Sequence, residues 1–346
     1  MAAEMQAIVL REHGGPEVLQ EARVPMPVPG PGEVRVRVRA VALNHLDLWV
    51  RRGGPAFRLD YPHRLGSEIA GDIDALGSGI TDLEVGARCV VNPGVSCGVC
   101  AACLSGQDNL CRRYRILGEN MQGGYGEYAV VPRANIAAYP GELSYTDAAA
   151  WLLTFLTAWQ MLVVKARVAP GDVVLVQGAG SGVGVAATQI CGLFGARVIA
   201  TAGSDDKLER ARALGAEHTI NYREQDFVAE VKRLTDKRGV DIVFEHVGGD
   251  TFARSIVATR NGGRVVVCGA TSGFTPQIDL RHIFVRQISV LGSTMGSKGD
   301  LYALLPHIAA GRLRPVVHQV LPLARAPDAH RILEERRAFG KLVLTP

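Results

Sequence analysis

The sequence has 346 residues, which is more than one ordinary hydrophobic core accommodates and suggests about two domains. Hydrophobic residues make up 47% and charged residues 21%, with a formal net charge of +4, as in soluble globular proteins. The chain has no apolar run of about 20 residues, and no basic segment followed by an apolar one near Met1. We therefore expect a cytoplasmic protein with no membrane span and no signal peptide.

Short strands separated by Gly, Pro and Asp are expected in the first part of the chain. The stretch Val34–Ala40, VRVRVRA, alternates strictly, so its valines should face a core while Arg35, Arg37 and Arg39 face water. The other basic residues are scattered, and we expect no nucleic-acid partner. Further strand patterns give this part a β-rich character and lie within 33–43, 68–77, 87–93 and 124–132.

The pattern changes near Ser144. The segment 144–162 is apolar at helical spacing, and Ser144 with Asp147 three residues later is typical of a helix start. After Pro170, strand and helix patterns alternate, which predicts a doubly wound, mostly parallel sheet. The helical patterns include 205–215 and 226–236, and the expected strands are 172–177, 197–201, 218–220, 241–245, 263–268 and 288–292. The last part of the chain leaves this rhythm and should return to the first domain.

A glycine-rich loop follows the strand 172–177 and precedes a helical stretch. Glycines at such a turn let the backbone approach a pyrophosphate, which binds at the helix N-terminus. A plain strand-to-helix turn without a ligand is the alternative. The candidate cofactor residues are Gly180, Ser181, Gly182, Val183 and Gly184, together with Gly269 after the strand 263–268.

The end of the next strand bears on the choice of cofactor. An NAD-binding chain usually places Asp or Glu there for the ribose 2′-hydroxyl, whereas this chain has Ala202 and Gly203. Ser204 and Lys207 lie nearby, which favours NADP(H) over NAD(H). The acids Asp205–Asp206 argue for NAD(H), unless they belong to the first turn of the following helix.

The sequence resembles the medium-chain dehydrogenase/reductases over essentially its whole length. The resemblance implies an α/β protein: a GroES-like β-barrel catalytic domain over 1–156 and 294–346, and a Rossmann domain over 157–293, with the active site in the cleft between them. The motifs that carry it are GGPEVL (14–19), LGSEIAGDIDALGSGI (65–80), GGYGEYAVVP (123–132), LTFLTAW (153–159) and FGKLVL (339–344).

Several residue roles follow from this resemblance. INYRE, at 220–224, is similar to the NADPH-dependent quinone oxidoreductase branch, so Tyr222 and Lys207 would contact the adenosine phosphate. Tyr222 as a packed aromatic is the alternative. His45 occupies a position that faces the cofactor pyrophosphate. The apolar strand 287–293 would lie at a sheet edge and join a second copy, giving a homodimer or a dimer-based tetramer.

Four cysteines with the spacing C-x2-C-x2-C-x7-C lie in the segment 92–113. Cytosolic thiols stay reduced, and four thiolates in tetrahedral geometry make a closed Zn²⁺ site with no open position for water or substrate. The spacing matches the family's structural-zinc lobe. We expect one structural zinc per chain, held by Cys97, Cys100, Cys103 and Cys111, whereas Cys89, Cys191 and Cys268 should be core residues.

A catalytic zinc needs a separate, open ligand set. In the zinc alcohol dehydrogenases that the chain resembles, the three zinc-ligand positions correspond to Asn44, Ser67 and about Leu153 of this chain. None of these residue types is a usual zinc ligand. A replacement site built from His45, Asp47 and Glu68 stays open as an alternative.

Without such a zinc, the remaining chemistry is hydride transfer to a carbon made electrophilic by conjugation. Asn44 is the candidate hydrogen-bond donor, unless it only caps a turn, and Thr157 would lie beside the nicotinamide. Three hypotheses remain: an NADPH-dependent reductase of quinones or α,β-unsaturated carbonyls, a zinc-type alcohol dehydrogenase, and a non-enzymatic cofactor-binding relative. The identity of the small-molecule substrate does not follow from the sequence.

Overall fold

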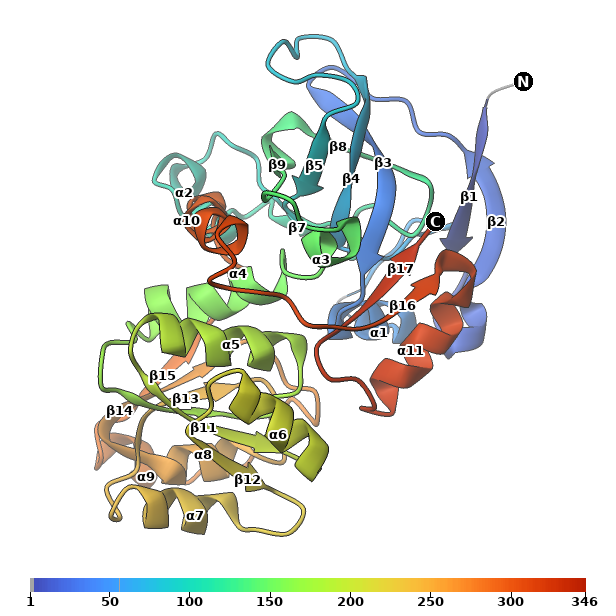
Figure 1. Cartoon of the computed structure of the whole chain (residues 1–346). Helices are drawn as coiled ribbons and strands as arrows, with labels where there is room; N and C mark the ends of the chain where they lie inside the picture. Colours follow the sequence, from blue (N-terminus) through green and yellow to red (C-terminus); the bar gives the residue numbers. More distant parts are fainter. Residues whose placement is uncertain (1–2, 56) are drawn as a thin grey trace. The chain divides into compact units, whose positions relative to one another are not determined.

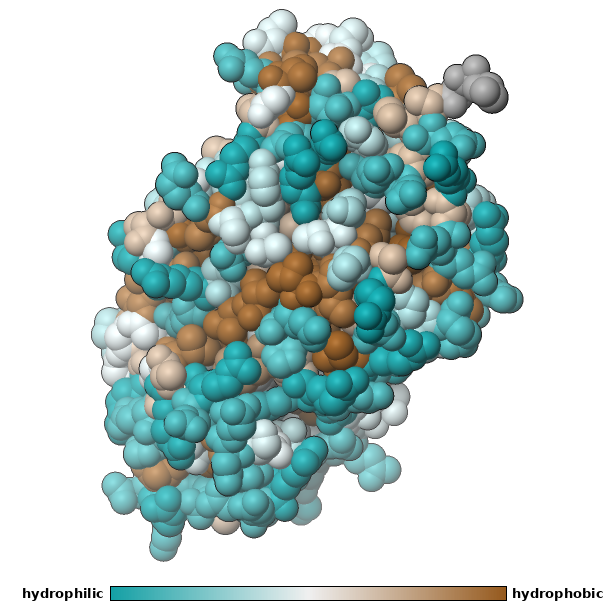
Figure 2. All heavy atoms as spheres, turned by 45° about the vertical axis from the view of Figure 1, so that its right-hand side comes forward, coloured by the Kyte–Doolittle hydropathy of each residue, from teal (hydrophilic) through white to brown (hydrophobic). Residues whose placement is uncertain are grey.

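The computed structural model describes residues 3–55 and 57–346, which form two compact units. Unit 1 contains Met1–Leu153, Ser297–Gly311 and Pro315–Pro346, and unit 2 contains Thr154–Gly296 and Arg312–Arg314. Within the described part of the chain, no helix is long and apolar enough to cross a membrane. Hydrophilic residues cover much of the face shown in Figure 2, with apolar residues gathered in places.

A seven-stranded sheet forms the centre of unit 1. Its order is β16-β17-β3-β4-β5-β9, with β8 also paired to β3. On β3 the valines are buried while Arg37 and Arg39 are exposed, as the alternation predicted, whereas Arg35 is half-buried and pairs with Asp74. The strand β17, close to the end of the chain, pairs antiparallel with β3. The strands are β3 (Glu33–Ala42), β4 (Glu68–Leu76), β5 (Arg88–Val91), β8 (Tyr128–Pro132), β9 (Ile136–Ala138), β16 (Val317–Pro322) and β17 (Lys341–Thr345).

Smaller elements complete unit 1. Two antiparallel pairs are β1 (Glu4–Val9) with β2 (Gln20–Pro25), and β6 (Gly94–Val95) with β7 (Arg115–Ile116). The helices are α1 (His45–Arg52), α2 (Ala101–Leu104), α3 (Tyr145–Ala149), α10 (Lys298–Ala309) and α11 (Ala326–Glu334). Single 3₁₀ turns are η1 (Pro16–Val18), η2 (Asp108–Leu110), η3 (Arg133–Asn135) and η5 (Leu323–Arg325).

Unit 2 contains a parallel six-stranded sheet in the order β12-β11-β10-β13-β14-β15, which is doubly wound around β10. All six strands predicted from the sequence form. Figure 1 shows α5 and α6 on one face of this sheet and α7 and α8 on the other. The strands are β10 (Val173–Val176), β11 (Arg197–Ala202), β12 (His218–Asn221), β13 (Val240–Glu245), β14 (Thr259–Val267) and β15 (Ser289–Gly292). The helices are α4 (Thr154–Trp159), η4 (Gln160–Lys165), α5 (Gly182–Leu193), α6 (Asp205–Ala213), α7 (Phe227–Leu234), α8 (Phe252–Ala258) and α9 (Arg281–Phe284).

The predicted helix at 144–162 is interrupted. Ser144 caps α3 as expected, since its side chain accepts from the Asp147 amide. The helix stops after Ala149 and resumes at Thr154 as α4. The Leu153 amide, which a continuous helix would pair with a preceding carbonyl, instead donates to the Glu68 carboxylate at 2.6 Å. A hydrogen bond to a residue distant in the sequence therefore replaces the one that would continue the helix.

Candidate metal centre and active site

The four lobe cysteines come together between β6 and β7. All four Sγ atoms lie within 4.8 Å of one another, with Cys97 and Cys103 3.8 Å apart and Cys100 and Cys103 3.5 Å apart. A zinc ion with Zn–S bonds of about 2.3 Å requires S–S separations of about 3.8 Å in a tetrahedron. The geometry therefore fits the closed structural zinc site that the spacing predicts.

Polar contacts hold the loops of the lobe and favour the thiolate form of Cys97. The amides of Cys97 and Arg113 donate to the Cys111 sulfur at 3.5 and 3.3 Å. The Val99 amide, and then the Arg113 guanidinium, lower the pKa of the Cys97 thiol. In contrast, burial raises the pKa of each thiol outside the lobe, which keeps it protonated. Cys89 and Cys191 are core residues as expected, whereas Cys268 is half-buried.

The cysteine cluster is the only group of three or more potential His, Cys, Asp or Glu ligands found in residues 3–55 and 57–346. The fold thus does not gather His45, Asp47 and Glu68 into a metal site. The carboxylates of Asp47 and Glu68 instead hold neighbouring backbone and side-chain groups in place.

Asp47 holds the backbone around Asn44. Its two carboxylate oxygens accept from the amides of Asn44 at 2.7 Å and Gly66 at 2.9 Å, which ties the start of α1 to the segment before β4. Burial raises the pKa of Asp47 to about 6, although these two hydrogen bonds oppose the rise. Asn44 precedes α1, and His45 is the first residue of that helix.

Glu68 is the centre of a buried polar network. One carboxylate oxygen accepts from the Leu153 amide at 2.6 Å, and the other accepts from Asn44 Nδ2 at 3.0 Å. The Lys341 ammonium lies 2.5 Å from that second oxygen, with exposed side-chain fractions of 4% for Lys341 and 0% for Glu68. Sequence reasoning missed Lys341, although a lysine inside the apolar motif FGKLVL is a signal that it has a buried partner.

The fold therefore brings together the three positions at which the family resemblance places a catalytic zinc. Asn44 and Leu153 both bind Glu68, and Ser67 precedes Glu68 in the chain. The Ser67 hydroxyl is buried, and no hydrogen-bond partner for it lies among the described residues. An amide, a hydroxyl and a leucine beside a lysine ammonium do not offer the thiolate or imidazole donors that zinc selects.

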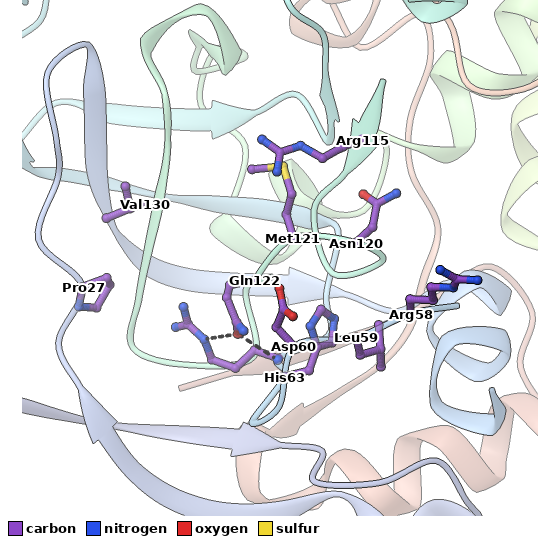
Figure 3. A pocket seen from close by; sticks show the side chains of 11 residues that line it. Pro27, Arg58, Leu59, Asp60, His63, Arg115, Asn120, Met121, Gln122 and Val130 are labelled. Atoms are coloured by element: carbon purple, nitrogen blue, oxygen red, sulfur yellow. Dashed lines mark hydrogen bonds between the residues drawn. The ribbon is translucent and has the colours of Figure 1, made fainter. Parts of the chain in front are cut away.

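A pocket of about 350 Å³, lined by both polar and apolar residues, opens elsewhere in unit 1 (Figure 3). The Gln122 side chain, which lines this pocket, accepts from the amide and the guanidinium of Arg64, at 3.0 and 3.2 Å. Burial lowers the pKa of Arg64 to about 10. None of the site residues predicted from the sequence is among those that line it: Pro27, Arg58, Leu59, Asp60, His63, Arg64, Arg115, Asn120, Met121, Gln122 and Val130.

In unit 2, the glycine-rich loop has the features of an anion site. Ser181 caps α5, accepting from the Gly184 amide at 2.9 Å. A Cβ atom at Gly184 would lie only 2.6 Å from the Gly178 carbonyl oxygen, so the close approach of loop and helix requires glycine. The amides of Gly182 and Val183 begin a 12-residue helix, where N–H groups and the helix dipole favour a phosphate.

His246 also supports this loop and was not predicted. Its Nε2 donates to the Gln177 carbonyl at 2.8 Å and lies 3.1 Å from the Ser181 hydroxyl. Burial lowers the pKa of the imidazole, so it stays neutral near pH 7. Because His246 follows β13 and the loop follows β10, only their adjacency in the sheet brings them together. Gly269 follows β14 at the same carboxyl edge.

The end of β11 lies beside two side chains from the segment after β12. A Cβ atom at Gly203 would be 2.7 Å from the Tyr222 hydroxyl and 3.1 Å from Arg223 Nε. Sequence reasoning proposed Tyr222 but missed Arg223, which follows it directly. Asp205 accepts from Asn221 Nδ2 at 3.1 Å and belongs to the first turn of α6. Ser204 and Lys207 lie at the start of the same helix.

Thr157 lies in α4 of unit 2. Its side chain is buried, and its hydroxyl has no hydrogen-bond partner among the residues that the structure describes. A buried hydroxyl without a partner carries a free-energy cost, which a bound group able to accept or donate a hydrogen bond would relieve.

Comparisons with known proteins cover the whole chain. Residues 30–141 match the alcohol dehydrogenase GroES-like domain, and residues 182–310 match the zinc-binding dehydrogenase family. A solved structure named as an NAD-dependent alcohol dehydrogenase is 56% identical, with a TM-score of 0.96, covering 99% of this chain and 100% of that one. The human quinone oxidoreductase is 28% identical, covering 98% of this chain and 97% of its own. A 2-haloacrylate reductase from Burkholderia sp is 31% identical, covering 99% of both chains.

Proposed function

Because this oxidoreductase belongs to the medium-chain dehydrogenase/reductase family, we propose that it transfers a hydride from NADPH to a quinone or an α,β-unsaturated carbonyl compound without a catalytic zinc. The observation that carries the proposal is the network at Asn44, Glu68 and Lys341. The three zinc-ligand positions carry Asn44, Ser67 and Leu153, none of which is a usual zinc ligand, and the Lys341 ammonium lies against both Asn44 and Glu68. The names of the quinone oxidoreductase and the 2-haloacrylate reductase agree with such substrates.

The chemistry required of the protein is modest for a conjugated substrate. NADPH bound at the glycine-rich loop would supply the hydride to the carbon β to the carbonyl group, and the resulting negative charge would spread over an enolate that takes its proton from water. Asn44 Nδ2 has two hydrogens, of which Glu68 accepts one, so the second can donate to the substrate oxygen. Oxidation of a simple alcohol instead needs stabilisation of a localised alkoxide, which zinc supplies as a Lewis acid.

The preference for NADPH is part of this proposal. The end of β11 lacks the acid that binds a ribose 2′-hydroxyl, and Arg223 adds a cation that was not considered from the sequence. Asp205, which argued for NADH, is hydrogen-bonded to Asn221. Tyr222 and Arg223 lie beside Gly203, and Ser204 and Lys207 lie at the start of the following helix, so these four side chains are the candidates for binding a 2′-phosphate.

A second candidate function is a zinc-type alcohol dehydrogenase. The solved structure with 56% identity is named an NAD-dependent alcohol dehydrogenase. If the chain has this function, it must recruit a metal through ligands other than Asn44, Ser67 and Leu153. A non-enzymatic cofactor-binding role is the third candidate. Cofactor binding without turnover of either class of substrate would distinguish it from the two enzymatic functions.

The test of the reaction is NADPH oxidation with an enone and a quinone, beside NADP⁺ and NAD⁺ reduction with ethanol and benzyl alcohol. We expect turnover of the conjugated substrates that survives dialysis against a chelator, with little alcohol oxidation. Asn44→Ala should lower kcat by roughly 100-fold and change KM less, because the hydrogen bond strengthens as charge develops. Zinc-dependent alcohol turnover, lost on chelation while the fold persists, would support the second candidate instead.

The assembly proposed for the chain is a homodimer, or a tetramer of such dimers, built on β15. This strand forms one edge of the unit 2 sheet, and Val290 on it is 42% exposed. Three residues that precede it in the chain are also exposed and apolar: Phe274, Phe284 and Val285. An unpaired apolar edge favours pairing with a second copy of the same strand.

We expect light scattering at micromolar concentration to give at least a dimer, and Val290→Lys to give a monomer. Val320→Lys is a matched control, because Val320 is 44% exposed on β16, an edge strand of the unit 1 sheet. This control should leave the assembly intact. A monomeric parent protein would refute the assembly proposal.

A further inference from the structure

Lys341 has an environment that is unusual for a lysine. It begins β17, and its side chain is buried beneath the turn that carries Asn44. Its ammonium group lies 2.5 Å from the Leu43 carbonyl oxygen, 2.6 Å from Asn44 Oδ1 and 2.5 Å from Glu68 Oε2. An ammonium group has three hydrogens and no acceptor, so these three oxygens satisfy it completely.

These contacts fix the orientation of the Asn44 amide. The oxygen must face the ammonium, because the reversed amide would place its NH₂ group against another donor. The Asn44 nitrogen then faces Glu68, which accepts one of its hydrogens at 3.0 Å. Only one orientation satisfies both neighbours, and it leaves the second Nδ2 hydrogen as the group available to a ligand.

We propose that Lys341 is a positioning residue that holds and polarises the Asn44 amide for hydrogen bonding to the substrate oxygen. A positive charge on the oxygen side of an amide draws electrons from its nitrogen and makes the remaining N–H a stronger donor. Glu68 balances the ammonium charge, which a buried lysine requires. The inference rests on the proposed role of Asn44, because Lys341 acts through that side chain.

The direct test is the Asn44 side-chain amide, observed by NMR in the full chain with ¹⁵N-labelled asparagine. The parent protein should show two inequivalent Asn44 Nδ2 protons, with one shifted downfield by Glu68 and protected from solvent exchange. Lys341→Met/Glu68→Gln removes both charges together, which avoids leaving one buried charge without a partner. Glu68→Gln alone should lose the downfield shift but keep two inequivalent Asn44 protons, because Lys341 still holds the amide oxygen, whereas the double variant should lose both features. Identical Asn44 amide signals in these two variants would overturn the inference, whatever substrate the enzyme uses.

The kinetic test uses the same double variant with an enone and NADPH. We expect kcat to fall by about tenfold or more while the NADPH dissociation constant stays constant. In an Asn44→Ala background the same two substitutions should cause no further loss of kcat, because their effect passes through Asn44. Equal losses in both backgrounds would show a general structural effect and refute the positioning role.

A matched control is Lys298→Met, which removes another partly buried lysine of unit 1. The Lys298 ammonium contacts Ser96 at 2.8 Å and Asp108 at 3.3 Å. Its loss should leave kcat and the Asn44 signals unchanged. If the parent protein reduces no conjugated carbonyl compound, the proposed function fails, and the NMR comparison still decides whether Lys341 positions Asn44.

Discussion

Cys100→Ser is expected to lower the melting temperature by about 10 °C or more, while activity per folded molecule stays unchanged. The lobe has little apolar core of its own, because Val99, Leu104 and Leu110 all face solvent, Leu104 with 76% exposure. A zinc ion bound by the four thiolates supplies the cohesion that such a core would provide. Serine at position 100 leaves three thiolates, which cannot close the tetrahedral site.

The measurement is calorimetry with and without a chelator, combined with a zinc count. The parent protein should hold one zinc per chain and lose stability on chelation, whereas Cys100→Ser should hold none and respond little. Cys191→Ala is the matched control: it removes a buried thiol of unit 2 that is not a ligand, and one zinc per chain should remain. Two tightly bound zincs per chain in the parent protein would contradict this interpretation and indicate a second metal site.

Features encoded by neighbouring residues were predicted well. The matching families and the parallel sheet confirm the expected GroES-like and Rossmann fold. The strand alternation at Val34–Ala40 depends on a period of two residues within one segment. The four cysteines also lie within one short segment, so their spacing alone indicates their geometry.

Features that depend on contacts between distant segments were missed. Lys341 and Asn44 are 297 residues apart, and only the pairing of β17 with β3 brings them together. The break in the predicted helix at 144–162 comes from Glu68, which is 85 residues before Leu153. His246 reaches the glycine loop in the same way, through adjacent strands. Local periodicity contains no information about such pairings, so the sequence predicted the elements and not these contacts.

The proposed preference for NADPH depends on the residues near the end of β11. Lys207→Ala and Arg223→Ala should each raise the NADPH dissociation constant by about 10- to 150-fold, since a hydrogen bond to a charged group contributes about 1.5–3 kcal/mol. NADH lacks the 2′-phosphate, so its dissociation constant should change little. Fluorescence titration of each variant with both cofactors measures this difference directly.

Measuring both NADPH and NADH binding at Lys207 and Arg223 separates a role in phosphate binding from a structural role. Arg223 lies beside Gly203 together with Tyr222, so a phosphate bound there would contact its guanidinium and would repel an acid placed at the same strand end. Arg233→Ala is the matched control, because Arg233 is an exposed arginine of α7 that pairs with Glu230. It should leave both affinities unchanged. Equal weakening of NADPH and NADH by Arg223→Ala would instead show that the residue supports the fold of the pocket. The assignment of NADPH would then rest on Ser204, Lys207, Tyr222 and the absence of an acid at the end of β11.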